Sequence, residues 1–586
     1  MTLTIAIQDR PGGIALPDLT ARLTRAVFST NAHGDEALQL SAPLSMASAF
    51  ERYDRPGLPH AIVTDGAALP FQGRVEDVAI RGNGIDLSAY GYSRSLSDAR
   101  YTALWSTTKV GDWRPVLTSE VANRTPELYG FDTNNRIQIA LPQGSVYGNA
   151  ANAGGMVYQI PSGSSRQIIG VSFNAIVTLP ANWIFQFNTY QANFSGGTNL
   201  TIDTGIGGVQ PVNKFYTFAG CDSFEFSVYN NTGGNYTVNN APNVWSVRIT
   251  NLRLVTTTAT MINTTHTVAR GAGVNVTATV GSTARMYVGQ YLHIGATAAL
   301  GEGVIVKQIL NSTQFVADFT AAAAIGVPVQ AFVIYADELV DDLVSTASTL
   351  NPDQLLSDTT QVQSPGMDLL DEVYEDAQPS TILDRLITMG DDQTPPRRWE
   401  WGVNGDRQLA FRPDGATAQT WYVDITALEL QRTFEQLANS AYAVYQDASN
   451  RTLRSAVATD AASIARFGLT RQQPIKAQTT SLVQATIERD AALDDTADPP
   501  PRFGLTFTAV YNAGGGRVPL WLPRAGDTIV IRNLPPTVSV NVDQLRTFRI
   551  ARTSCDLIAR TLTIEPLVPL PTMASLIARG LRGQTT

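Results

Sequence analysis

The sequence predicts a mostly β, multi-domain protein with α+β parts. The chain has 586 residues, which is more than a single hydrophobic core usually organises. Charged residues make up only 16% of the chain, against about 25% in an average soluble protein. The polar surface must therefore consist mainly of Thr, Asn, Ser and Gln, which suit strands and turns better than long exposed helices.

Composition and periodicity divide the chain into five expected domains. They are a β-barrel domain over 1–112, a jelly-roll-like β-sandwich over 113–260, a small β-barrel over 261–333, an α+β domain over 334–460, and a β-barrel domain with a terminal helix over 461–586.

The first segment reads as a barrel because apolar and polar residues alternate in short stretches, beginning with Leu3, Ile5 and Ile7. The second segment is rich in Asn, Gly, Thr and aromatic residues and shows almost no helical periodicity. It closes on the stretch 245–255, which alternates as a half-buried strand does. In the third segment, short strands separated by Gly-containing turns predict a small barrel.

The remaining segments mix helices with strands. Helices are predicted where apolar residues recur three and four positions apart, over 336–345, from an N-cap at Ser380 to Gly390, over 480–493 and over 573–578. Between the second and third helices, Trp399, Trp401 and Val403 alternate up to Asn404-Gly405, the preferred two-residue turn of a β-hairpin. Alternation resumes from Phe503 and continues in the strands 528–532 and 547–551.

The charge pattern narrows the classes of partner. The net charge is −9, and no stretch gathers enough Arg to form a basic stripe for stable nucleic-acid binding. The first ten residues alternate as a strand does and show no secretory signal, so we expect synthesis in a cytoplasm. No run of about eighteen apolar residues is present, so no stable membrane insertion is expected.

The sequence offers little for catalysis, and neither a metal nor a cofactor is predicted. Cys221 and Cys555 are expected to be buried apolar thiols. The histidines lack the spacing of a helical metal motif and are expected in turns or at the surface: His33, His60, His266 and His293. No nucleophile elbow, phosphate-binding loop or dinucleotide fingerprint is present.

Two sets of residues leave other functions open. Adjacent carboxylates could in principle supply the paired acids of a glycoside hydrolase, although each pair fits a solvated face better: Asp341-Asp342, Asp371-Glu372 and Asp494-Asp495. Aromatic rings in the second segment could stack on a sugar, and the candidates for glycan binding are Trp183, Tyr229 and Tyr236. The alternative is that such rings belong to the core of the sandwich, which then serves as decoration or as a spacer.

Several short stretches, in a fixed order, carry a resemblance to a known family. They are 71–78 (FQGRVEDV), 87–92 (LSAYGY), 101–105 (YTALW), 374–376 (YED), 399–402 (WEWG), 411–413 (FRP), 420–423 (TWYV), 439–445 (NSAYAVY) and 524–528 (RAGDT). In these stretches the chain resembles the tail hub or baseplate hub proteins, a class of minor tail proteins, of tailed bacteriophages. The resemblance covers roughly 1–112 and 334–586.

The resemblance implies a structural virion protein of the distal tail tip, made in the bacterial host. It implies a homotrimeric ring that closes the tail tube, organises host attachment and lets phage DNA pass during genome ejection. The implied partners are the distal tail or tail tube ring, the tape measure protein, and a tip fibre or receptor-binding protein. The resemblance leaves out 113–333, so the sandwich and the small barrel are expected as insertions between two barrel-like hub domains.

The insertion makes a geometric prediction. Trp105 and Tyr335 should lie near each other, because inserted domains leave and re-enter their host at one surface point. The rival to the hub is a carbohydrate-binding protein of the tail tip that contacts a host surface glycan through the sandwich. A glycoside hydrolase is a third reading, weakened because no peptidase or lysozyme module is recognisable.

Overall fold

The structure is a computed structural model of the whole chain. It describes residues 3–9, 22–45, 59–109, 112–115, 129–131, 137–141, 146–147, 152–162, 164, 166–191, 195–204, 209–238, 245–256, 261–295, 301–366, 368–391, 397–403, 405–424, 428–431, 437–446, 451–477, 482–497, 502–532 and 547–567. Strands predominate among them and form several sheets, which confirms the predicted mostly β, multi-domain fold. The helix expected over 573–578 lies outside the described residues.

The chain divides into two compact units, which we call unit 1 and unit 2. Unit 1 comprises 1–99, 340–365 and 378–586. Unit 2 comprises 100–339 and 366–377. The main part of unit 2 therefore interrupts unit 1 in the sequence.

Unit 1 contains strands from both ends of the chain. The N-terminal strands are β1 (Leu3–Gln8), β2 (Arg25–Asn31), β3 (Gly34–Pro43), β4 (His60–Asp65), β5 (Ala68–Arg81) and β6 (Gly84–Gly91). The later strands are β30 (Thr420–Asp424), β31 (Leu428–Gln431), β36 (Arg502–Phe507), β37 (Val510–Tyr511), β38 (Arg517–Val518), β39 (Thr528–Arg532), β40 (Thr547–Asp556) and β41 (Thr561–Pro566).

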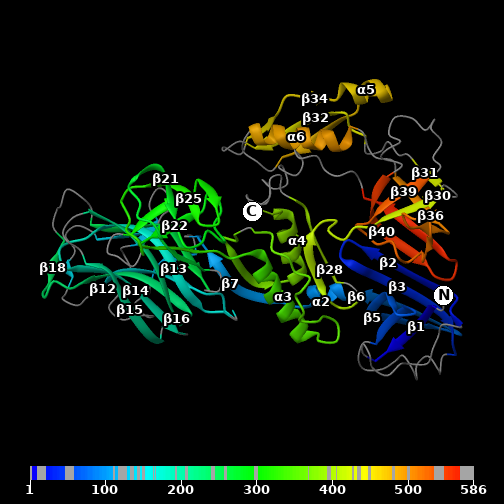
Figure 1. The fold of residues 1–586 in the computed structure, drawn as a ribbon, viewed down its shortest axis with the longest axis horizontal. Coiled ribbons are helices and arrows are strands. Elements are labelled where there is room, and N and C mark those ends of the chain that lie inside the picture. The colour runs from blue at the N-terminus through cyan, green and yellow to red at the C-terminus, as the bar shows by residue number, and fades with distance from the viewer. Residues whose placement is uncertain are drawn as a thin grey trace. The chain divides into compact units, whose positions relative to one another are not determined.

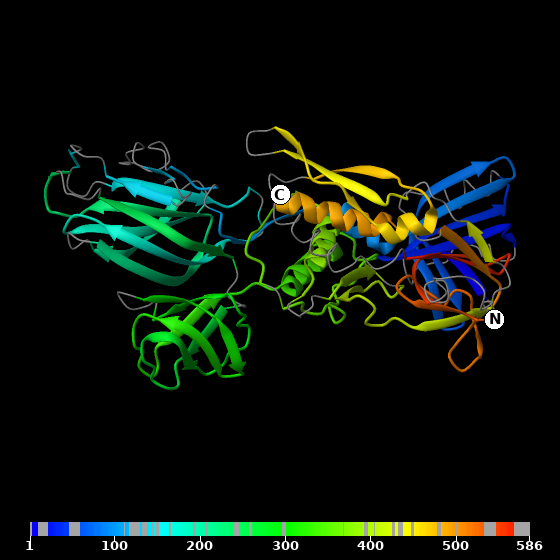
Figure 2. The same cartoon turned by 90° about the horizontal axis from the view of Figure 1, so that it is seen from above.

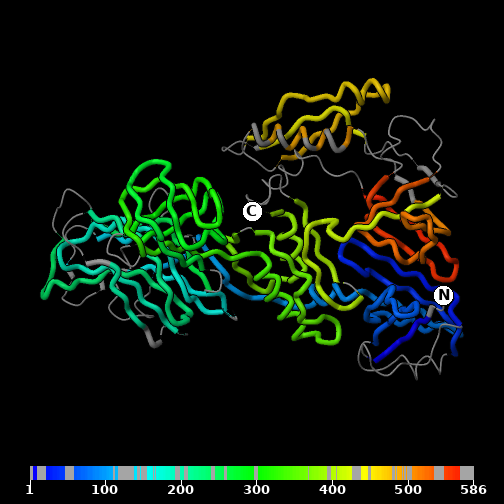
Figure 3. Tube along the Cα trace, viewed as in Figure 1, coloured from blue at the N-terminus to red at the C-terminus, as the bar shows by residue number. Residues whose placement is uncertain are grey.

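The two groups of strands meet where β2 pairs antiparallel with β40. The register runs from Val27 opposite Asp556 to Thr30 opposite Thr553. The hydroxyls of Thr30 and Thr553 share a buried hydrogen bond of 2.6 Å. Because of this pairing, both groups belong to a single 16-stranded sheet, and the strands from the two chain ends run side by side in Figures 1 and 3.

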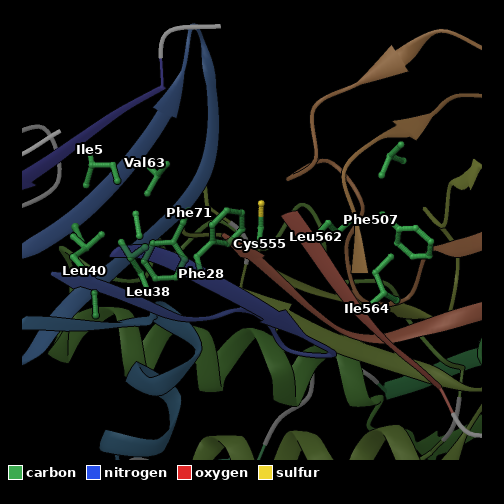
Figure 4. Close-up of a cluster of buried hydrophobic side chains, with 14 of the residues drawn as sticks. Ile5, Phe28, Leu38, Leu40, Val63, Phe71, Phe507, Cys555, Leu562 and Ile564 are labelled. Carbon is green, nitrogen blue, oxygen red and sulfur yellow. The ribbon is translucent and has the colours of Figure 1, made fainter. Parts of the chain in front are cut away.

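Buried side chains from both groups of strands form one hydrophobic cluster. It includes Phe28 and Phe71 from the N-terminal group and Phe507, Cys555 and Leu562 from the C-terminal group (Figure 4). Alternation along the strands places these side chains on the inner face. Cys555 is buried and free, and so is Cys221 in unit 2, as the sequence predicts.

In the sequence, several helices and a hairpin lie between the N-terminal and the later group of strands. They are η2 (Tyr92–Arg94), α2 (Ser95–Asp98), α3 (Ala336–Leu350), α4 (Pro379–Met389), β28 (Trp399–Val403) and β29 (Leu409–Pro413). Helix α4 begins after Gln378 with Pro379 at its first position, so the predicted N-cap at Ser380 is wrong. Proline is favoured at that position because its fixed φ suits the helix and it lacks an amide hydrogen.

The hairpin itself is as predicted, but its turn is not. Val403 pairs with Leu409, so residues 404–408 form the connection. The prediction of a two-residue Asn404-Gly405 turn is therefore wrong. Arg407 adopts a positive φ of 67° in the longer loop, and Asn404 itself lies outside the described residues.

Residues 437–497 form a small sheet with two helices. The elements are β32 (Ser440–Gln446), β33 (Thr452–Arg454), β34 (Ala458–Thr459), α5 (Ala461–Phe467), β35 (Gln472–Lys476) and α6 (Leu482–Thr496). Strand β32 pairs in parallel with β35, and this pairing crosses the domain boundary expected after residue 460. Ala441, Leu493 and Ala497 form part of its core.

Unit 2 contains a β-sandwich, and one of its sheets includes residues 101–107 and 372–377, which lie outside the range of 113–260 expected for this domain. One sheet holds β7 (Tyr101–Thr107), β9 (Tyr129–Phe131), β10 (Ile137–Ala140), β13 (Ile168–Thr178), β16 (Val209–Cys221), β19 (Ser246–Val255) and β27 (Glu372–Ala377). The other holds β8 (Arg114–Pro115), β12 (Asn152–Gln159), β14 (Trp183–Gln191), β15 (Ser195–Thr204) and β17 (Ser223–Asn230), and β11 (Val146–Tyr147) pairs separately with β18 (Tyr236–Thr237). Phe173, Phe185 and Phe226 are fully buried in the core between the sheets.

The small barrel follows the sandwich and is drawn in green in Figure 2. Its sheets hold β20 (Met261–Thr265), β22 (Tyr291–Ile294), β23 (Glu302–Ile305) and β26 (Pro328–Phe332), and β21 (Gly273–Thr279), β24 (Gln308–Asn311) and β25 (Gln314–Phe319). Leu292, Phe315 and Val329 are fully buried in its single core. From the sequence, short strands are expected around 274–280, 291–294, 304–309 and 314–317. The first, second and fourth match β21, β22 and β25, whereas β23 and β24 were expected as one strand, and β20 and β26 were not expected.

The chain leaves and re-enters at one place within unit 2. Arg253 donates from Nε to Ser106 Oγ at 2.8 Å and from Nη1 to the Phe332 carbonyl. Its Nη2 binds Asp368 Oδ1 at 2.7 Å, and Asp368 in turn accepts from the Ile334 amide. Since one guanidinium contacts both ends of the 107–331 segment, the predicted proximity of Trp105 and Tyr335 is confirmed.

In the described part of the chain, no helix is long and apolar enough to cross a membrane.

Candidate functional site

The three predicted glycan-binding rings lie in different environments. Trp183 begins β14 and is completely buried, with the Tyr236 ring packed edge-on at 5.6 Å between centroids. A ring without an open face cannot stack on a sugar, so Trp183 acts as a core residue. Tyr229 and Tyr236 are half-buried, and their role in binding stays a prediction.

Tyr229 shares a sheet face with a group of polar side chains that the sequence reading missed. We call this group the outer polar row: Gln186, Asn188, Tyr190, Glu225 and Ser227. These residues alternate with the core residues Phe185, Phe187, Phe224 and Phe226, so they point away from the sandwich core. The signal was present as amide, hydroxyl and carboxyl groups at every second position of β14 and β17.

Hydrogen bonds connect the outer polar row around Glu225. Its Oε2 accepts from Tyr190 Oη at 2.6 Å and from Asn188 Nδ2 at 2.8 Å. Asn188 Nδ2 also donates to Ser227 Oγ at 3.0 Å. A buried carboxylate needs such partners, and the network fixes the side chains in one arrangement.

Unit 1 contains a cleft of about 570 Å³, which we call the junction cleft. It is lined by residues of β3, the hairpin β28–β29 and the segment before β39, including Asp35, Trp401, Glu400, Arg524 and Asp527. Strand β3 meets β28 where Gly34 bridges to Val403. The cleft therefore lies where the two groups of strands and the hairpin come together.

The acidic groups of the junction cleft are used in joining these parts. Arg524 Nη1 binds Asp35 Oδ1 at 2.8 Å. Burial raises the pKa of Asp35 above its usual value, although Arg524 opposes this shift. Asp527 accepts from the amides of Gln419 and Arg524 and from Trp421 Nε1 at 2.8 to 3.0 Å.

Glu400 in the same cleft pairs with Arg412 at 2.9 Å. Because Asp35, Glu400 and Asp527 all bind protein groups, this arrangement favours a structural joint over general acid–base chemistry. Among the described residues, no group of three or more His, Cys, Asp or Glu could hold a metal ion.

Three histidines are buried, contrary to the prediction of turn or surface positions. Their exposed fractions are 4% for His60, 0% for His266 and 3% for His293. Each has a neighbour that binds the neutral ring: Tyr92 Oη lies 2.8 Å from His60 Nδ1, Arg270 Nε donates to His266 Nε2, and Asn213 Oδ1 lies 2.9 Å from His293 Nδ1. Burial lowers the pKa to about 4 for His60 and His266 and to about 3 for His293.

Comparisons with known proteins found tail proteins among solved structures. The 43 kDa tail protein of prophage MuSo2 from Shewanella oneidensis is 9% identical, with a TM-score of 0.38 and coverage of 97% of this chain and 98% of that one. The prophage tail protein gp18 from Listeria monocytogenes EGD-e is 7% identical, with a TM-score of 0.32 and full coverage of both chains. The tail protein from Neisseria meningitidis MC58 is 9% identical, with a TM-score of 0.24 and coverage of 54% of this chain and 94% of that one.

These TM-scores all lie below 0.5, so the similarities carry no argument about fold or function. No protein-family model matches the chain. No curated protein matches it either.

Proposed function

We propose that the chain is a structural tail protein of a tailed bacteriophage and forms the hub that closes the distal end of the tail tube. The observation that carries the proposal is the pairing of β2 with β40, which joins the N-terminal and C-terminal strands of unit 1 in one sheet. These are the regions in which the sequence resembles tail hub proteins. A scaffold of this kind requires extensive β structure and no catalytic constellation.

The assembly follows from the same proposal. A homotrimer with two barrel-like regions per chain presents six such regions, which match a tail tube of sixfold geometry. The distal tail ring or tail tube protein, the tape measure protein and a tip fibre or receptor-binding protein would be its neighbours at the tail tip of the virion. The role is non-enzymatic, and no cofactor is required.

The test is stoichiometry measured together with position. Native mass spectrometry of the purified chain and class averages of the phage particle, with the chain tagged after residue 586, should show three copies in a ring at the distal tail. A sixfold ring, a monomer in the particle, or a tag located away from the tail tip would contradict the proposal.

A second candidate function is recognition of a host glycan by the sandwich. The half-buried rings of Tyr229 and Tyr236 favour it, because a partly exposed aromatic ring can pack against the apolar face of a sugar. Replacing Tyr229 or Tyr236 by Ala should reduce adsorption and leave particle assembly intact. Failed assembly with normal adsorption of the surviving particles would show that the rings are core residues.

A further inference from the structure

A pocket of about 550 Å³ lies between the sandwich and the small barrel of unit 2. Its walls come from β13, from β19 and from the start of β22, and they include Ser172, Thr250, Asn251, Tyr287 and Gln290. Pockets of this volume hold small molecules. The pocket is distinct from the outer polar row, since it is lined by the other sheet of the sandwich.

The two walls are fixed to each other by direct contacts. Phe215 of β16 stacks on Phe332 of β26 with ring centroids 4.2 Å apart. Tyr291 Oη accepts hydrogen bonds from Asn174 and from Asn213, the latter at 3.1 Å. Asn213 also binds His293 Nδ1. The pocket is therefore formed without a ligand.

The lining carries no unpaired charge. Arg253 and Asp368 are its ionised side chains, and they form a two-pronged ion pair with N–O distances of 2.7 and 2.8 Å. Tyr287 Oη donates to the same carboxylate at 2.9 Å. His293 is buried and its pKa falls to about 3, so the ring is neutral near pH 7. A ligand gains little here from carrying a net charge.

Gln290 supplies an unused hydrogen-bond donor. Its side chain lines the pocket and is 2% exposed, and its Nε2 has no hydrogen-bond partner among the described residues. The Tyr287 amide donates to Gln290 Oε1 at 3.2 Å, which fixes the orientation of the carboxamide. A buried donor without a partner is unfavourable, so an oxygen atom of a ligand would satisfy it.

Backbone strain lies in the same wall. Asn251 has a positive φ of 49° inside β19, where the register with β13 shifts between Ser172 and Asn174. Non-glycine residues adopt this conformation rarely, and such positions gather at binding sites. Asn251 itself lines the pocket at this bulge.

We propose that this pocket binds an uncharged polyhydroxylated ligand, a single neutral sugar residue, with Gln290 Nε2 donating to one of its oxygens. Neutral amide and hydroxyl groups line the pocket beside the rings of Tyr287 and Tyr291, and this mixture suits a molecule that has both hydroxyls and an apolar ring face. The site holds its ligand whether or not the chain is a tail hub.

The experiment measures sugar binding to the whole chain by saturation-transfer NMR. The probes are glucose, galactose, mannose and N-acetylglucosamine, with glucuronate as the charged comparison. At least one neutral sugar should bind. Gln290→Glu, which keeps the acceptor for the Tyr287 amide but removes the donor, should weaken binding about tenfold or more. The matched control is Gln308→Glu, which adds the same charge at an exposed position of the same barrel and should not change binding.

Asn251→Gly is the second variant, since glycine accepts a positive φ without strain and the chain can fold normally. It should also weaken sugar binding, because it removes the Asn251 side chain from the lining of the pocket. Absence of binding by all four neutral sugars would overturn the proposal, and so would undiminished binding to both variants. Tighter binding of glucuronate than of the neutral sugars would overturn it as well. So would loss of sugar binding in Tyr229→Ala together with unchanged sugar binding in Gln290→Glu.

Discussion

The buried histidines are residues whose environment the sequence does not reveal. His60 lies in β4 and His293 in β22, and each side chain faces inward because of strand alternation. A single polar residue in a short strand gives no sign of a partner such as Tyr92 or Asn213, which lies far away in the sequence. Trp183 illustrates the converse, since an aromatic residue that could have been exposed is a core residue.

We predict that the protein loses stability as the pH falls below about 6.5. In the unfolded chain a histidine takes up a proton near pH 6.5, whereas in the folded chain His60 and His266 do so only near pH 4 and His293 near pH 3. Between pH 6.5 and these lower values the unfolded state therefore binds more protons than the folded state. The free energy of unfolding consequently decreases as the pH is lowered. At pH 5 the loss is about 2 kcal/mol for each histidine.

Urea unfolding at pH 7.5 and pH 5 measures this effect. His293→Gln, which offers an amide to Asn213, should reduce the difference between the two pH values. His33→Gln should leave it unchanged, because the His33 side chain is 35% exposed. Equal stability of the natural chain at the two pH values would contradict the prediction.

At the scale of elements, the close approach of β28 to β3 requires a glycine at position 34. Gly34 has a φ of 99°, and a Cβ atom there would lie 2.3 Å from the Val403 carbonyl oxygen. Backbone atoms cannot move aside cheaply, so any side chain separates the hairpin from β3. This contact also closes one side of the junction cleft.

We predict that Gly34→Ala lowers the free energy of unfolding by about 2 to 4 kcal/mol, from backbone strain and overpacking together. The matched control is Gly66→Ala. Gly66 also has a positive φ, of 63°, but no atom lies within 4 Å of the position its Cβ would take. Strain alone should then cost about 1 to 2 kcal/mol. Equal losses in urea unfolding would show that the β3–β28 contact is not tight.

Sequence patterns predicted elements better than their connections. Strands such as β19, β22 and β39 were found because alternation is a local property. The turn after Val403 was missed because Asn-Gly fits a two-residue turn, whereas the pairing of Val403 with Leu409 sets a longer loop. The pocket near Gln290 could not be predicted, because it depends on how the small barrel packs on the sandwich.

At the scale of the whole molecule, the sequence order and the spatial order differ. Strand β40 follows β2 by several hundred residues and still pairs with it, and unit 2 interrupts unit 1 between them. Arg253 shows how the interruption is tolerated, because it holds the ends of the inserted segment together inside unit 2. An insertion with adjacent ends disturbs its host little. This explains how the resemblance to tail hub proteins can cover 1–112 and 334–586 and leave out the segment between them.

The last prediction concerns the charge of the channel in the proposed ring, and it rests on the hub proposal. DNA must slide through the ring without binding, and Arg side chains in the lumen would hold phosphates. We therefore expect part of the 51 Asp and Glu residues, from the barrel regions 1–112 and 460–586, to line the channel. The Arg side chains of these regions would face neighbouring subunits.

Charge reversal tests this expectation. In a trimer, each channel-facing acid changed to Lys introduces three cations, and roughly three phosphate contacts give DNA retention a steep dependence on salt. Ejection should be slower at low ionic strength and should recover as salt is added. The same reversal on the outer surface should lack this salt dependence. A trimer structure with a positive potential along most of the channel would refute the prediction, because such a channel would retain the DNA it must release.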